Sequence, residues 1–139
     1  MIDFHYETDF TLQDESKYTD WITRIIESEV ASFSQIDFVF CSDEYLYTLN
    51  RQYLRHETYT DIITFDYSED RMLSGDIYIS VERVADNAVQ WKQTFQIEML
   101  RVMAHGILHM LGYNDKSQKG REEMRRLEEE KIKLFHVEQ

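Results

Sequence analysis

The amino-acid sequence predicts an α+β, or mixed α/β, fold in which one small sheet packs against several helices. Short runs rich in β-forming residues occur up to residue 80, and apolar residues at helical spacing dominate the chain after it. No proline and no linker or low-complexity segment interrupts the 139 residues, a length close to that of one domain. We therefore expect residues 1–139 to form a single domain with about four strands and about five helices.

The first elements follow from the spacing of apolar residues. Residues 2–6 alternate apolar and polar side chains, which predicts a strand. Apolar residues at helical spacing predict a helix from about Asp14 to Phe33, with Asp14 or Ser16 as its N-cap. Residues 36–41 are rich in β-formers and predict a buried strand.

Three further elements are predicted in the middle of the chain. Ser42 is a suitable cap for a short helix that extends to about Leu54. Residues 61–65 and residues 76–80 predict two more strands. A polar loop around residues 68–71 joins these two strands.

The rest of the chain has helical periodicity. One helix begins near Val81 and carries Trp91, a second runs from about Thr94 to Leu111, and the last runs from about Ser117 to Phe135. Trp21 and Trp91 are expected in the core and not on base-stacking surfaces. Oppositely charged pairs along the last helix predict a solvated face made of Glu122, Glu123, Arg125, Arg126, Glu128, Glu129 and Glu130.

The composition narrows the class of protein. The formal net charge is −12, and an acidic surface repels phosphate backbones, which argues against broad, non-specific nucleic-acid binding. Any RNA contact then depends on a local basic patch or on a metal ion. One cysteine, Cys41, and an N-terminus unlike a signal peptide predict a reducing, cytoplasmic setting. The most apolar stretch, residues 99–111, is interrupted by three polar side chains and is too short for a membrane span, so no membrane partner is expected.

The chemistry of the chain is concentrated between residues 105 and 115. His105 and His109 are four residues apart, so a helix places them on one face, where both can bind the same metal ion. Gly112 is suited to a left-handed helix C-cap, after which the chain can fold back and deliver Asp115. Two nitrogens, one oxygen and one open position describe a catalytic metal site. Zn²⁺ fits this set best, and Ni²⁺ or Mn²⁺ is also acceptable.

A pair of histidines at this spacing is weak evidence by itself, because two unrelated helix histidines give the same pattern. The surrounding helix is apolar, however, and buried polar groups need partners, which a shared metal ion supplies to both rings. Gly106 occupies the position that holds a catalytic glutamate in H-E-x-x-H metallopeptidases. Two reasons for this glycine remain open: the close approach of another backbone or of a substrate, and tight helix packing. Glu98, two turns earlier, is expected to be solvated or to support a metal ligand from behind.

Polar residues outside this helix supply further candidates. Asp61 and Asp76 begin strands, where they are suited either to orient the histidines through hydrogen bonds or to cap the strand ends. Basic residues within positions 51–56, including Arg55, are suited to hold a phosphate or form a solvated loop.

The segment from His105 to Asp115 reads H-G-I-L-H-M-L-G-Y-N-D. It resembles the signature H-G-x-L-H-x-x-G-Y-D-H of the YbeY family of rRNA-maturation endoribonucleases, in which three histidines bind zinc. Here Asn114 replaces the usual aspartate and Asp115 replaces the third histidine. Because aspartate binds zinc at a similar bond length, the resemblance implies a zinc site made of His105, His109 and Asp115.

Two further segments carry the same resemblance. Residues 50–53 followed by residues 60–65 are similar to the family pattern N-x-x-Y-R … T-D-V-L-S-F, and residues 74–79 are similar to L-G-D-I-x-I. The family's functional arginine falls on Leu54, and Arg55 lies one place on. The resemblance therefore implies Arg55 as the candidate catalytic cation.

The resemblance implies a metal-dependent endoribonuclease that prefers single strands and acts in 16S rRNA 3′-end maturation and ribosome quality control. Its partner would be rRNA or the small ribosomal subunit, and Thr60 in the similar segment becomes a candidate to contact substrate or support a ligand. Two other functions remain open from the residues themselves. One is a metallopeptidase or another metallohydrolase, and the other is a non-catalytic ribosome-associated module with a structural zinc ion.

Overall fold

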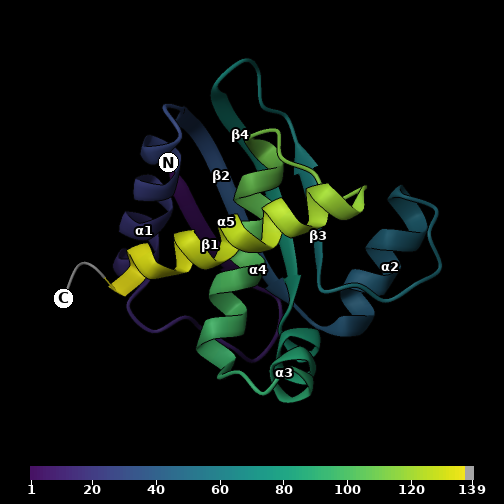
Figure 1. Cartoon of the computed structure of the whole chain (residues 1–139). Coiled ribbons are helices and arrows are strands. Elements are labelled where there is room, and N and C mark those ends of the chain that lie inside the picture. The colour runs from purple at the N-terminus through teal and green to yellow at the C-terminus, as the bar shows by residue number, and fades with distance from the viewer. Residues whose placement is uncertain (137–139) are drawn as a thin grey trace.

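Four strands form one mixed sheet in the order β1-β2-β4-β3 (Figure 1). The computed structural model describes residues 1–136, with side chains up to Phe135. β1, β2 and β4 are parallel and β3 pairs antiparallel to β4 at the sheet edge. The strands are β1 (Ile2–Tyr6), β2 (Ser32–Cys41), β3 (Ile62–Asp66) and β4 (Met72–Ser80).

Five helices surround this sheet in the described part of the chain. They are α1 (Glu15–Ser28), α2 (Asp43–Tyr53), α3 (Val81–Gln90), α4 (Phe95–Met110) and α5 (Gln118–His136). The predicted α+β class, with four strands and five helices, is confirmed. None of the described helices is long and apolar enough to cross a membrane.

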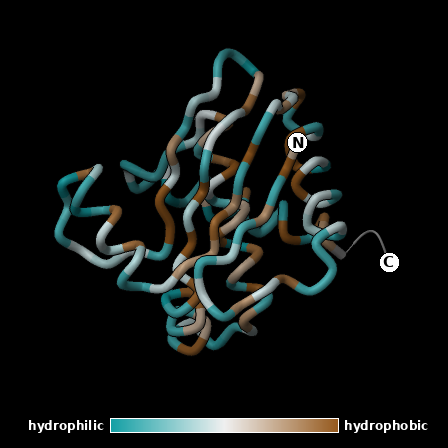
Figure 2. Tube along the Cα trace, turned by 180° about the vertical axis from the view of Figure 1, so that it is seen from behind, coloured by the Kyte–Doolittle hydropathy of each residue, from teal (hydrophilic) through white to brown (hydrophobic). Residues whose placement is uncertain are grey.

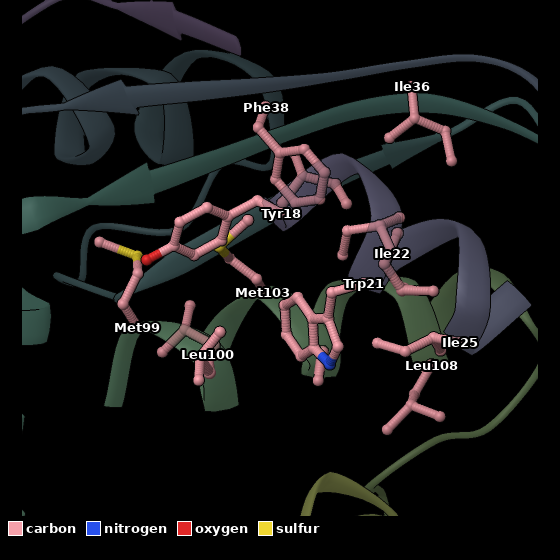
Figure 3. Packing of buried hydrophobic residues seen from close by; sticks show 14 of the residues in the cluster. Tyr18, Trp21, Ile22, Ile25, Ile36, Phe38, Met99, Leu100, Met103 and Leu108 are labelled. Atoms are coloured by element: carbon pink, nitrogen blue, oxygen red, sulfur yellow. The ribbon is translucent and has the colours of Figure 1, made fainter. Parts of the chain in front are cut away.

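α4 is the central helix of the fold, because it contacts β3, β4, α1, α3 and α5. The main core lies between the sheet, α1, α4 and α5. Figure 2 shows hydrophobic segments along the strands. Figure 3 shows how α1 packs on α4 through Tyr18, Trp21, Ile22, Ile25, Met99, Leu100, Met103 and Leu108. A smaller cluster lies under α2.

Gly106 allows α4 to lie close to the sheet. A Cβ atom at this position would come within 3.0 Å of a side-chain carbon of Ile62 and 3.1 Å of one of Ile77. Tight packing of helix on sheet is therefore the reason for a glycine here, although glycine costs about 1 kcal/mol relative to alanine inside a helix.

The predicted helix from Asp14 to Phe33 is too long, because α1 ends at Ser28 and Phe33 belongs to β2. Val30 has a φ of 56°, which reverses the chain after the helix. Ser32 then starts to pair with β4, which itself begins at Met72 and not at residue 76. Apolar residues at helical spacing cannot reveal this pairing, because it depends on a strand 40 residues away in the chain.

The two tryptophans lie in different environments, so the prediction that both belong to the core is wrong for Trp91. Trp21 is 2% exposed and donates a hydrogen bond from Nε1 to the carbonyl of Lys131 (2.7 Å). Trp91 is 61% exposed. Trp91 is the C-cap of α3, and Lys92 after it has a φ of 56°. Because the helix ends at Trp91, the helical spacing that predicts a buried indole does not apply to it.

A buried ion pair joins α5 to the segment that follows α1. Lys131 of α5 is 2% exposed and donates from Nζ to Glu29 Oε2 (2.8 Å), just after α1. Tyr113, just after α4, donates from its hydroxyl to Glu29 Oε1 (2.7 Å). Burial raises the pKa of Glu29, whereas the hydrogen bonds from Lys131 and Tyr113 lower it, and the net pKa is below the ordinary value of 4.5.

We expect Glu29→Gln to lower the free energy of unfolding by about 2 kcal/mol at pH 7, because the buried Lys131 loses its closer carboxylate and keeps only that of Glu130, 3.2 Å from Nζ. The depressed pKa of Glu29 contributes stability above pH 4.5 that is lost as the pH falls through the folded-state value. Urea unfolding of both proteins should therefore give free energies that converge below pH 4.5. A difference that stays constant into acid would contradict this assignment.

Candidate metal centre

The last turns of α4 place His105 and His109 on the same face, with their Nε2 atoms 2.9 Å apart. Asp115 lies beyond the helix end and faces both rings. Its Oδ2 atom is 3.6 Å from Nε2 of His105, and its Oδ1 atom is 3.8 Å from Nε2 of His109. Three side chains of types that can bind a metal ion thus converge on one point, as their sequence spacing predicts.

The chain reaches this point through the turn that ends α4. Gly112 has a φ of 106°, the left-handed conformation that glycine adopts at low cost. The amide of Gly112 donates to the carbonyl of His109 (3.0 Å), and that of Tyr113 donates to Leu108 (3.1 Å), which is the Schellman arrangement. Asn114 then accepts a hydrogen bond from the amide of Lys116 (3.2 Å), so its side chain shapes the turn that presents Asp115.

The spacing of the three donor atoms fits one tetrahedral metal ion. Zinc bonds of about 2.0–2.1 Å to nitrogen and oxygen place neighbouring ligand atoms roughly 3.3 Å apart. The two Nε2 atoms are 2.9 Å apart, and the carboxylate of Asp115 approaches His105 through Oδ2 (3.6 Å) and His109 through Oδ1 (3.8 Å), distances close to this edge length on either side. Among the described histidine, cysteine and acidic residues, no fourth joins the group, which leaves one position for solvent or substrate.

Glu128 of α5 contacts His105 at Nδ1, the ring nitrogen that does not face His109 and Asp115. Its Oε2 atom is 2.6 Å from Nδ1 of His105, and its side chain is 9% exposed. A carboxylate in this position keeps the proton on Nδ1 and directs the lone pair of Nε2 toward the metal position. Burial lowers the pKa of His105, but the hydrogen bond to Glu128 and its charge outweigh burial, and the net pKa is raised.

The environment of His109 favours the neutral ring that a metal ion requires. Burial lowers its pKa and the neighbouring His105 lowers it further, against opposing effects of Asp115 and of a hydrogen bond to the backbone of Tyr113. The two histidines are therefore both fixed through a second contact, one by a carboxylate and the other by the backbone.

Glu128 is the important residue that the sequence analysis missed, because it was assigned to the solvated face of the last helix. The structure shows it buried, with 7% of the residue exposed. Met124, Leu127, Glu128 and Lys131 are all buried and follow the spacing i, i+3, i+4, i+7, which is the pattern of an inward helix face. This spacing, which includes the charged residues Glu128 and Lys131, is the feature of the sequence that indicates a buried Glu128.

Arg101 compensates the charge of the buried carboxylates near the site. Its guanidinium lies 3.6 Å from Glu98, 3.5 Å from Glu128 and 2.5 Å from Glu129. Glu98 is 4% exposed, so it is not solvated. Burial raises the pKa of Glu98, and the charge of Arg101 opposes that effect.

A hollow of about 830 Å³ opens beside the three ligands. Thr60 and Asp61 line it, as do Leu54, Trp91, Gln93, Glu98, Arg101 and Arg125. A second hollow of about 420 Å³ lies on the α5 side and shares His105, Asp115, Arg125 and Glu128 with the first. Arg125 lines both. It forms no ion pair with any residue in the described part of the chain, although its charge lowers the pKa of Glu98.

The remaining predicted site residues differ in their placement. Asp61 accepts a hydrogen bond from Asn87 (3.3 Å), and burial raises its pKa, while the charge of His105 lowers it. Asp76 pairs in register with Asp37 of β2, and its charged neighbours are Asp37 and His5, so the structure does not bring it to the histidines.

Arg55 is exposed, has a φ of 58° and follows Leu54, which lines the hollow. Arg55 itself is not among the lining residues. The structure therefore places this predicted catalytic cation at the margin, and its role stays a prediction.

The mixed sheet and the histidine–histidine–aspartate group at the end of a buried helix define a small α+β protein with a candidate metal site of the open type. Comparison with known proteins identifies the family. The family described as endoribonuclease YbeY matches residues 3–136. This chain belongs to that family, and the resemblance inferred from the sequence is confirmed.

Full-length relatives agree with this membership. The chain is 52% identical to the endoribonuclease YbeY of Flavobacterium johnsoniae over 139 residues, which is the whole of both chains. It is 53% identical to that of Christiangramia forsetii over 138 residues, which cover 99% of this chain and 96% of the other. The solution structure of a Thermotoga maritima protein shares the fold, with a TM-score of 0.69, 24% identity, and coverage of 99% of this chain and 91% of the other.

We expect Glu128→Ala to weaken zinc binding roughly 10- to 100-fold, because the ring of His105 loses the carboxylate that fixes its tautomer and orientation. Glu128→Gln should weaken binding less, since its amide oxygen still accepts the hydrogen bond. Competition with a chelator of known affinity measures both effects. The control is Glu123→Gln, which changes an exposed carboxylate on the same helix and should bind zinc like the wild type. If a folded Glu128→Ala protein also binds zinc like the wild type, Glu128 does not support His105 as a metal ligand.

Proposed function

We propose that this protein is a metal-dependent endoribonuclease that cleaves single-stranded RNA in the cytoplasm. Its specific task would be 3′-end maturation of 16S rRNA and ribosome quality control, with rRNA or the small ribosomal subunit as its partner. The observation that carries the proposal is the convergence of His105, His109 and Asp115 on one point with a free coordination position beside a hollow. The names of the relatives, endoribonuclease YbeY, support the choice of RNA as substrate.

The metal we propose is Zn²⁺, because two imidazole nitrogens and one carboxylate oxygen form a typical catalytic zinc set. Ni²⁺ and Mn²⁺ remain acceptable to the same ligands. A divalent cation held here would supply Lewis acidity, which lowers the pKa of water and polarises a phosphate oxygen.

The chain's own residues would position the substrate and hold charge. Glu128 fixes the ring of His105, and the packed α4 keeps both histidines at constant spacing. Arg125 lines both hollows, as do His105 and Asp115, and it forms no ion pair with another described residue. We assign Arg125 to contact a phosphate oxygen and stabilise the charge that develops there, and Arg55 at the margin is a second candidate for the same task.

The two alternative functions are less consistent with the geometry. In H-E-x-x-H metallopeptidases the residue after the first histidine is the general base, but here it is Gly106, which packs against Ile62 and Ile77. A structural zinc module would be expected to have four protein ligands, and the described residues supply three.

We expect His105→Ala to lower the rate of RNA cleavage at least about 100-fold, because the protein loses a ligand of the group that stabilises charge in the transition state. The substrate is single-stranded RNA, and the protein is assayed after zinc loading and after chelation, with circular dichroism to verify folding. His5→Ala, an exposed histidine that contacts Asp37 and not the metal site, is the control and should cleave normally. Full activity in a folded His105→Ala protein that holds no metal would refute the proposal.

A further inference from the structure

Trp91 is a large aromatic side chain that the fold leaves uncovered. It is 61% exposed, and it lines the same hollow as the histidines and Asp115. Within the described chain its indole makes neither a ring contact nor a hydrogen bond, whereas Trp21 has both. An exposed indole gains stability when another flat, apolar surface covers it.

The backbone around Trp91 is held firmly although the indole is free. The amide of Trp91 donates to the carbonyl of Asn87 (2.9 Å), and the amide of Gln93 donates to Ala88 (2.9 Å). Lys92 between them adopts a φ of 56° and turns the chain from α3 into α4. Trp91 therefore lies in a hydrogen-bonded turn between α3 and α4, which fixes the position of its backbone.

From this position we propose that Trp91 is a stacking surface for an unpaired base of the RNA substrate. The inference rests on the proposed endoribonuclease function and adds to it the feature of the substrate that is recognised. Stacking on an aromatic ring suits single-stranded RNA, because its bases have free faces, whereas the bases of a duplex are covered by their neighbours.

The charge of the hollow favours contact through a base over contact through the phosphate backbone. Its lining includes the carboxylates of Asp61, Asp66, Glu98, Asp115 and Glu128, but only Arg101 and Arg125 as cations. Arg101 is already paired with glutamates. A phosphate is therefore accepted near Arg125 and the metal position, while the end at Trp91 is suited to an uncharged base.

The amides near Trp91 suit the edge of such a base. Asn87 and Gln93 line the same hollow, and the side chain of Gln93 forms no hydrogen bond with other described residues, so it can pair with donors or acceptors of a base. By the rise of 1.5 Å per residue, His105 lies about 15 Å along α4 from Phe95, its first residue. The stacked base would thus belong to a nucleotide that is removed from the phosphate at the metal position.

The test uses the fluorescence of Trp91, which a stacked base should quench. The protein is titrated with short single-stranded oligoadenylate in the presence of a chelator, so that binding is measured without cleavage. The wild type should show quenching, and Trp91→Phe should bind with similar affinity without it, because the remaining Trp21 is buried. Trp91→Ala should bind roughly tenfold more weakly, and with zinc it should show a raised KM at an unchanged kcat.

Tyr67→Ala is the matched control, since Tyr67 is 62% exposed and lines neither hollow. It should bind and cleave like the wild type. If Trp91→Ala matches the wild type in affinity and KM while RNA is cleaved, the stacking role is overturned and the proposed function stands. If duplex RNA quenches Trp91 as strongly as single strands do, recognition of an unpaired base is overturned. If the zinc-loaded wild type neither binds nor cleaves single-stranded RNA, both proposals fail.

Discussion

Packing of α4 between the sheet and three helices is the constraint on which the site depends. The helix contacts the sheet, α1, α3 and α5, and Gly106 allows it to approach β3 and β4 closely. Such packing fixes the rotation of the helix, and therefore the direction in which His105 and His109 point. The left-handed turn at Gly112 brings Asp115 to the two histidines, because it directs the chain back over the end of the same helix.

The polar interior near the site forms a connected system. The buried Glu128 contacts His105 on one side and Arg101 on the other. A buried carboxylate costs free energy unless it is paired, and here the pairing also orients the ring of His105. The buried face of α5 therefore contributes both to the core and to the candidate metal site through Glu128.

Much of this arrangement could be predicted from local sequence patterns. The α+β class, the helix that carries His105 and His109, and the turn at Gly112 depend on neighbours in the chain, and the structure agrees with them. The predictions that were wrong concern residues whose structure depends on contacts with distant segments of the chain. Phe33 pairs with β4 instead of continuing α1, and Glu128 is buried because α5 crosses α4 beside His105.

Trp91 was misplaced for a local reason, since the left-handed residue Lys92 ends the periodicity just beyond it. Its sequence context gives no signal for such a conformation, because lysine rarely adopts a positive φ. The acidic composition, in contrast, anticipated a real property of the hollow, whose described carboxylates outnumber its arginines. Recognition of RNA by such a surface has to rely on few cations, on the metal and on contacts to the bases.

The most direct test of the account is X-ray absorption spectroscopy of the zinc-loaded protein. Zinc bound at this site should be four-coordinate, with two imidazole nitrogens and two oxygen donors at about 2.0–2.1 Å, one oxygen from Asp115 and the other from solvent. A spectrum with fewer than two imidazoles, or with a sulfur donor, would contradict the claim that these side chains form an open metal site.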